Sequence, residues 1–130
     1  MVSWFQLTAI AACGALGALC RYGLTIAVTQ IPGGSSVLGT TFVNVLGCAL
    51  LGAITAVGPA ETEAAERLNL AIRVGFLGSL TTFSTLVAES STLASSQRVG
   101  AASGYVLANL VIGWLVFGIA SSLVKGWIHA

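Results

Sequence analysis

The stretch Gly75-Phe76-Leu77-Gly78-Ser79-Leu80-Thr81-Thr82-Phe83-Ser84-Thr85 places two glycines and a ladder of hydroxyls inside an otherwise apolar segment. An unpaired polar group in hydrocarbon costs roughly 2–7 kcal/mol, so such groups persist only where they are buried in protein or line a wet path. The glycines weaken a helix just before the ladder begins. A helix that breaks near Gly78 frees carbonyl oxygens for a cation, while the hydroxyls beyond it can donate to an anion. The stretch therefore predicts an ion pathway.

The composition around this stretch is that of an integral membrane protein. The chain has 130 residues, of which 56% are hydrophobic and 7% charged, with a mean hydropathy of +0.97; soluble domains are about 25% charged. A spanning helix needs about 20 apolar residues, so the length accommodates about four spans and no separate soluble domain. The net charge of +1 provides no basic patch, which argues against a nucleic-acid partner.

We therefore predict an all-α membrane protein in which residues 1–130 form a single domain of four transmembrane helices, with a break in the third. The expected spans are residues 4–29, 37–57, 70–95 and 99–124. Pro and Gly punctuate the turn before the second span, and Glu and Arg residues mark the solvated connection before the third.

A few polar side chains within the spans are candidates for the pathway. Arg21 is either a snorkelling anchor or a cation that faces an ion vestibule. Asn44 is either an interhelical hydrogen-bonding residue or an amide donor in a pore. Glu89 is either a wet vestibule residue or an end cap, and Tyr105 and Asn109, spaced i and i+4, can line one path. No catalytic set is present, so we do not expect an enzyme.

The distribution of basic residues sets no firm orientation in the membrane. Four spans place Arg67, Arg73 and Lys125 on one side and Arg21 and Arg98 on the other. Because this bias is small, the chain can insert both ways, and oppositely inserted copies can pair as an antiparallel dimer about an in-plane two-fold axis.

Three motifs carry a resemblance to a known family. They are GALGALCRY at residues 14–22, GTTFVNVLG at residues 39–47 and GFLGSLTTFST at residues 75–85. In a four-span chain of this size, these motifs resemble those of the Fluc (CrcB-type) fluoride channels, and the resemblance covers essentially the whole sequence.

The resemblance implies a dual-topology homodimer in the cell (inner) membrane, with two antiparallel fluoride pores that export fluoride from the cytoplasm passively and so confer fluoride resistance. It also implies a structural sodium ion at the dimer centre, held by the backbone carbonyls of Gly78 and Thr81. The vestibule residues would be Arg21 and Glu89. Hydrogen-bond donors and positive aromatic edges suit a strongly hydrated anion, and the expected fluoride path comprises Asn44, Thr82, Phe83, Ser84, Thr85, Leu86, Tyr105 and Asn109.

Two positions depart from the family pattern, and two other functions compete. Leu86 stands where the family has a second phenylalanine, and Asn109 where it has a hydroxyl. Leu86 motivates one alternative, a non-conducting subunit that needs a second homologue to form pores. The other alternative is a small multidrug-type dual-topology transporter, which would need a membrane carboxylate, and Glu89 is the only candidate in the predicted spans.

Overall fold

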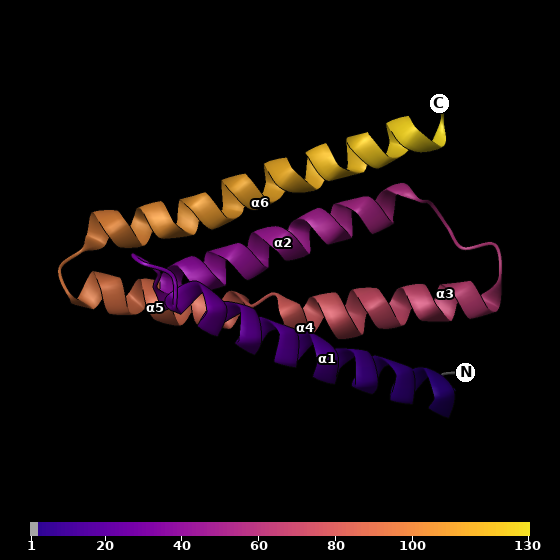
Figure 1. Ribbon diagram of the computed structural model, residues 1–130, viewed down its shortest axis with the longest axis horizontal. Helices are drawn as coiled ribbons and strands as arrows, with labels where there is room; N and C mark the ends of the chain where they lie inside the picture. Colours follow the sequence, from indigo (N-terminus) through magenta and orange to yellow (C-terminus); the bar gives the residue numbers. More distant parts are fainter. Residues whose placement is uncertain (1–2) are drawn as a thin grey trace.

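The computed structural model describes residues 3–130, and these form an antiparallel arrangement of four long helical segments with no strand among them. Figure 1 shows both termini at the same end of the molecule as α3. The helical elements are α1 (Trp4–Thr29), α2 (Ser36–Ala56), α3 (Glu63–Leu70), the π-helical turn η1 (Ala71–Leu77), α4 (Gly78–Leu80), α5 (Phe83–Ser95) and α6 (Val99–Ile128).

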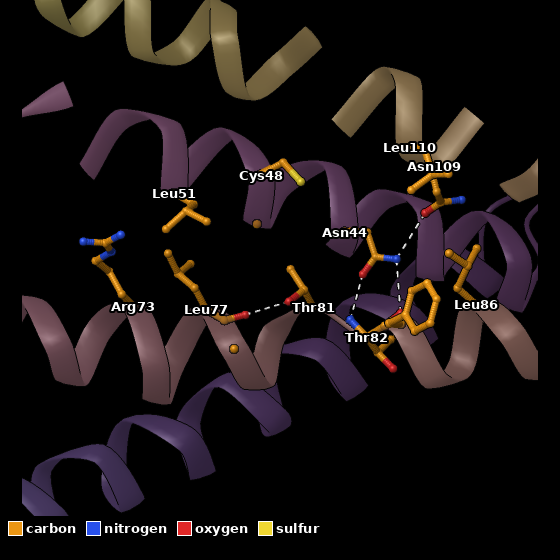
Figure 2. A pocket seen from close by; sticks show the side chains of 13 residues that line it. Asn44, Cys48, Leu51, Arg73, Leu77, Thr81, Thr82, Leu86, Asn109 and Leu110 are labelled. Atoms are coloured by element: carbon orange, nitrogen blue, oxygen red, sulfur yellow. Dashed lines mark hydrogen bonds between the residues drawn. The ribbon is translucent and has the colours of Figure 1, made fainter. Parts of the chain in front are cut away.

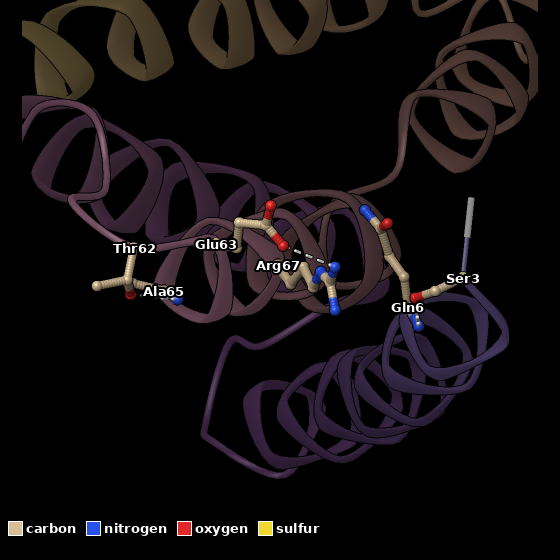
Figure 3. Close-up of polar contacts among 6 residues, drawn as sticks. All are labelled: Ser3, Gln6, Thr62, Glu63, Ala65 and Arg67. Carbon is tan, nitrogen blue, oxygen red and sulfur yellow. Dashed lines mark hydrogen bonds and ion pairs between the residues drawn. The ribbon is translucent and has the colours of Figure 1, made fainter. Parts of the chain in front are cut away.

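Four segments are long and apolar enough to cross a membrane: α1, α2, the run from α3 to α5, and α6. The 21 residues of α2 extend about 31 Å, close to the roughly 30 Å of a bilayer core. The third segment begins at Glu63, earlier than residue 70, because a polar turn precedes its apolar part. Thr62 Oγ1 caps this turn by accepting from Ala65 N–H at 3.2 Å, and Arg67 pairs with Glu63 at 3.0 Å (Figure 3).

Glycines allow the helices to approach closely. A Cβ atom on Gly17 of α1 would overlap the carbonyl oxygen of Phe76 in η1. A Cβ on Gly75 would lie 2.6 Å from the oxygen of Ile10 and 2.9 Å from Cys13 Cβ. Gly75 thus serves the close contact between α1 and η1, which fixes the third segment against the first.

The third segment leaves helical geometry at two threonines. Thr81 has φ −83° and ψ 157°, and Thr82 has φ −150° and ψ 113°. Gly78, where the sequence suggested the helix weakens, has helical angles (φ −63°, ψ −28°). The departure lies at the threonines because Thr82 caps α5: its Oγ1 accepts from Thr85 N–H at 3.2 Å. We call residues Thr81 and Thr82 the link.

Candidate ion pathway

Asn44 of α2 holds the backbone of the link through both ends of its side chain. Thr82 N–H donates to Asn44 Oδ1 at 2.8 Å, and Asn44 Nδ2 donates to Thr82 O at 3.3 Å (Figure 2). The backbone N–H can only donate, so it fixes which end of the Asn44 amide faces Thr82. A buried backbone group without a partner is costly, and Asn44 removes that cost at the point where the helix stops.

The second Asn44 N–H is bound to α6. Asn44 Nδ2 donates to Asn109 Oδ1 at 3.1 Å. Asn109 in turn donates through Nδ2 to Thr41 Oγ1 at 3.1 Å and to Tyr105 O at 3.0 Å. The amides of Asn44 and Asn109 therefore form one chain of hydrogen bonds, oriented at one end by the Thr82 N–H and at the other by the Tyr105 carbonyl.

One cavity, of about 320 Å³, lies beside this chain and is open at the protein surface. Its polar end holds Asn44, Thr82 and Asn109, together with the ring of Phe83. Arg73 lies at the opposite end of the cavity, beyond an apolar stretch (Figure 2). We call this space the central cavity.

A second cavity, of about 280 Å³, lies between α1, α2 and α5 and has a more polar lining. Arg21, Glu89 and Thr85 line it together with Thr82, which also lines the central cavity. Glu89 Oε2 accepts from the Tyr105 hydroxyl at 2.6 Å. We call this space the vestibular cavity, and it meets the central cavity at Thr82.

The hydroxyls after the link form a local cluster. Thr82 Oγ1 donates to Thr85 Oγ1 at 2.9 Å and lies 3.3 Å from Ser84 Oγ. Ser84 is exposed and Thr85 half-buried. The three hydroxyls therefore lie together at the N-terminal cap and first turn of α5.

The carbonyls around the link differ in their partners. Arg21 Nε donates to Ser79 O at 2.9 Å, so Arg21 contacts the end of α4 as well as the vestibular cavity. Thr81 Oγ1 and Thr81 N–H both donate to Leu77 O, at 3.0 and 3.1 Å. Among residues 3–130, none donates a hydrogen bond to the carbonyl oxygens of Gly78 or Thr81, and both residues line the central cavity.

Phe83 and Leu86 differ in exposure. The Phe83 side chain is 72% exposed, whereas Leu86 is 3% exposed and belongs to the core. Both residues line the central cavity. Leu86 forms part of its buried wall, whereas Phe83 projects toward the protein surface. Their roles in conduction remain predictions.

Three contributors were not among the predicted site residues. Thr41 accepts from Asn109, Thr40 lines the vestibular cavity, and Arg73 lines the central cavity. The two threonines precede Asn44 by one helical turn and share its face, which is the signal that could have found them. Arg73 carried a signal too, since an ionisable residue within a span suggests function.

Comparison with known proteins identifies the family. The family described as CrcB-like protein, Camphor Resistance (CrcB), matches residues 8–121. The chain belongs to this family. The resemblance read from the three motifs is thereby confirmed, and the four apolar helices are those of a multi-pass protein of the cell membrane.

Curated relatives match over most of their length. A protein of Rhodopirellula baltica named Fluoride-specific ion channel FluC is 39% identical over 141 residues, covering 94% of this chain and 95% of the relative. Fluoride-specific ion channel FluC 2 of Thermobifida fusca is 38% identical, covering 92% and 88%. A Fluoride-specific ion channel FluC of Citrifermentans bemidjiense is 42% identical, covering 82% and 86%.

Proposed function

We propose that this chain forms a fluoride-selective passive channel that exports fluoride from the cytoplasm and so confers fluoride resistance. Its relatives are named fluoride-specific ion channels, which supports a channel and not an enzyme. The observation that carries the proposal is the Asn44 amide, bound to the link where the two cavities meet. The named relatives favour neither alternative function.

Fluoride export by this route needs hydrogen-bond donors and no coupling to a proton gradient or to ATP hydrolysis. Fluoride is small and strongly hydrated, so a pore has to replace its water with hydrogen-bond donors. The amide of Asn44 and the hydroxyls of Thr82, Ser84 and Thr85 lie near the link and would supply such donors once fluoride displaces their present partners. An inside-negative potential favours the exit of each anion by about 2.3 kcal/mol per 100 mV, so a passive path is sufficient.

We infer that two oppositely inserted copies build the pores. The central cavity is open at the protein surface, and Phe83 projects from it with 72% of its side chain exposed. A second copy, related by a two-fold axis in the membrane plane, would close the cavity and surround the ring with protein. The positive edge of the ring would then face the anion path.

The backbone carbonyls at and just before the link also suit a structural sodium ion. The carbonyl oxygens of Gly78 and Thr81 accept no hydrogen bond from the described residues, and both residues line the central cavity. Backbone carbonyls at an interrupted helix are ligands for Na⁺, and two protomers would supply two such pairs. The ion would bind the two third segments together at the dimer centre.

Arg21 and Glu89 are proposed as the vestibule of the pore. They line one cavity with Thr85, and the Glu89 carboxylate is held by Tyr105. The guanidinium provides positive charge where an anion would approach Thr82. Arg21 also bonds Ser79 O, so it has a structural contact in addition to the proposed electrostatic one.

Ion efflux from liposomes containing only this purified chain tests the proposal. Fluoride should leave the liposomes when valinomycin and potassium relieve the charge imbalance, while chloride is retained. Silence from a folded dimer would indicate a subunit that needs a second homologue. Fluoride movement that requires a proton gradient would indicate a transporter.

A further inference from the structure

The hydrogen bonds of Asn44 leave it no free donor. Its carboxamide has two N–H groups: one binds Thr82 O and the other binds Asn109 Oδ1. An anion that takes a hydrogen bond from Asn44 must therefore displace one of these two acceptors. This step rests on the proposed function, because it concerns how the same amide meets fluoride.

The two acceptors differ in how easily fluoride can displace them from Asn44. The Thr82 oxygen belongs to the backbone of the link, whose N–H is held by the same Asn44 side chain. The Asn109 oxygen lies on a side chain that lines the central cavity, and rotation of that side chain moves it without moving the backbone. Asn109 Oδ1 accepts from no described residue other than Asn44.

We propose that Asn109 is a positioning residue. Between ions, its carboxamide oxygen accepts from the Asn44 N–H that fluoride would bind, and each fluoride that passes displaces this oxygen. Its Nδ2 bonds to Thr41 and Tyr105 set the orientation in which the oxygen faces Asn44. In the empty pore, Asn109 thus provides the Asn44 N–H with a hydrogen-bond acceptor. The same acceptor competes with fluoride for that N–H.

Because the Asn109 oxygen competes with fluoride, removing this acceptor and strengthening it should change the half-maximal fluoride concentration in opposite directions. Asn109→Leu keeps the branching at Cγ and has no acceptor, so fluoride would bind Asn44 without a competitor. The fluoride concentration that gives half-maximal efflux should fall, by about fivefold if one ordinary hydrogen bond is lost. Asn109→Asp keeps the acceptor and adds charge, and hydrogen bonds to charged acceptors are roughly twice as strong. It should raise the half-maximal concentration.

Initial efflux rates measured over a range of fluoride concentrations, with the purified chain in liposomes, test this role. Thr55→Val is the control: it removes a hydroxyl on the same helix as Asn44 whose bond is to Leu51 O and leaves Asn109 and its partners intact, so the half-maximal concentration should stay unchanged. A purely structural Asn109 would lower the maximal rate in the Leu variant, with no shift in that concentration, and this result would overturn the proposal.

Three further results of these efflux measurements also bear on the role of Asn109 or on the proposed function. A fall in the half-maximal concentration for Thr55→Val as large as that for Asn109→Leu would overturn the proposal, because the Thr55 variant leaves the Asn109 oxygen in place. If the Leu variant does not fold, Asn109→Asp decides alone, and an unchanged or lower half-maximal concentration contradicts the proposal. A wild-type protein that conducts no fluoride refutes the proposed function itself, which distinguishes the two failures.

Discussion

Replacing Asn44 with alanine tests the centre of the proposed pathway. The substitution removes the acceptor for Thr82 N–H and the two donations, to Thr82 O and to Asn109 Oδ1. It therefore removes an amide donor from the fluoride path and also releases the backbone of the link. We expect fluoride efflux to be abolished or greatly slowed, with the dimer still formed.

The size of the stability effect follows from those three hydrogen bonds. Each contributes about 1 kcal/mol net, with a range of about 0.5–1.5 kcal/mol, so their loss should lower the free energy of unfolding by about 3 kcal/mol. Water that enters from the neighbouring cavities would satisfy part of the released backbone and reduce this figure. The link, and not the whole fold, should be the region that loosens.

Two measurements on the same preparation separate conduction from stability. A fluoride electrode records efflux from liposomes, and thermal unfolding in detergent reports stability. Thr55→Val is a control on the same helix, because it removes only the local bond from Thr55 Oγ1 to Leu51 O at 2.7 Å and should leave both readouts near wild type. If the Asn44→Ala variant released fluoride at the wild-type rate, Asn44 would serve only helix packing and fluoride conduction would not require it.

Three further predictions follow. Gly17→Ala should lower the melting temperature, because its Cβ would overlap the Phe76 oxygen and overpacking costs about 1–3 kcal/mol; Gly23→Ala, which meets no atom within 4 Å, should not. In a cysteine-free background, a cysteine added at the C-terminus should be labelled from both sides of the membrane, and labelling from one side only would exclude dual topology. Phe83→Leu should slow fluoride efflux below that of wild type and Leu86→Phe should accelerate it; a silent wild type rescued only by Leu86→Phe would identify a partner subunit.

The helices were the most predictable part of the structure. Composition and apolar run length alone lead to four spans, since a helix of about 20 apolar residues is what a bilayer selects. The observed α1 has the bounds that the sequence suggested. The start of the third segment at Glu63 was harder to place, because a capped polar turn has no apolar signal of its own.

The partners of each polar side chain could not be read from the sequence. Asn44 is conspicuous in an apolar run, but its contact with Thr82 joins residues 38 positions apart, and only the packed fold brings them together. Gly78 illustrates the converse: glycine marks a potential weakness, but this residue keeps helical angles, and the cap that Thr82 provides sets where the next helix begins. Phe83 and Leu86 are three residues apart, which gives them a shared helix face, but this spacing does not predict their different burial.

The reversal potential of the purified chain in a planar bilayer tests the central claim most directly. With a tenfold fluoride gradient and equal chloride on both sides, a fluoride-selective passive pore should reverse near the fluoride equilibrium potential, about 59 mV for a monovalent ion. With equal fluoride on both sides and a tenfold chloride gradient instead, the reversal potential should be zero. A reversal potential that follows chloride, or the absence of fluoride current from the folded protein, would contradict the account.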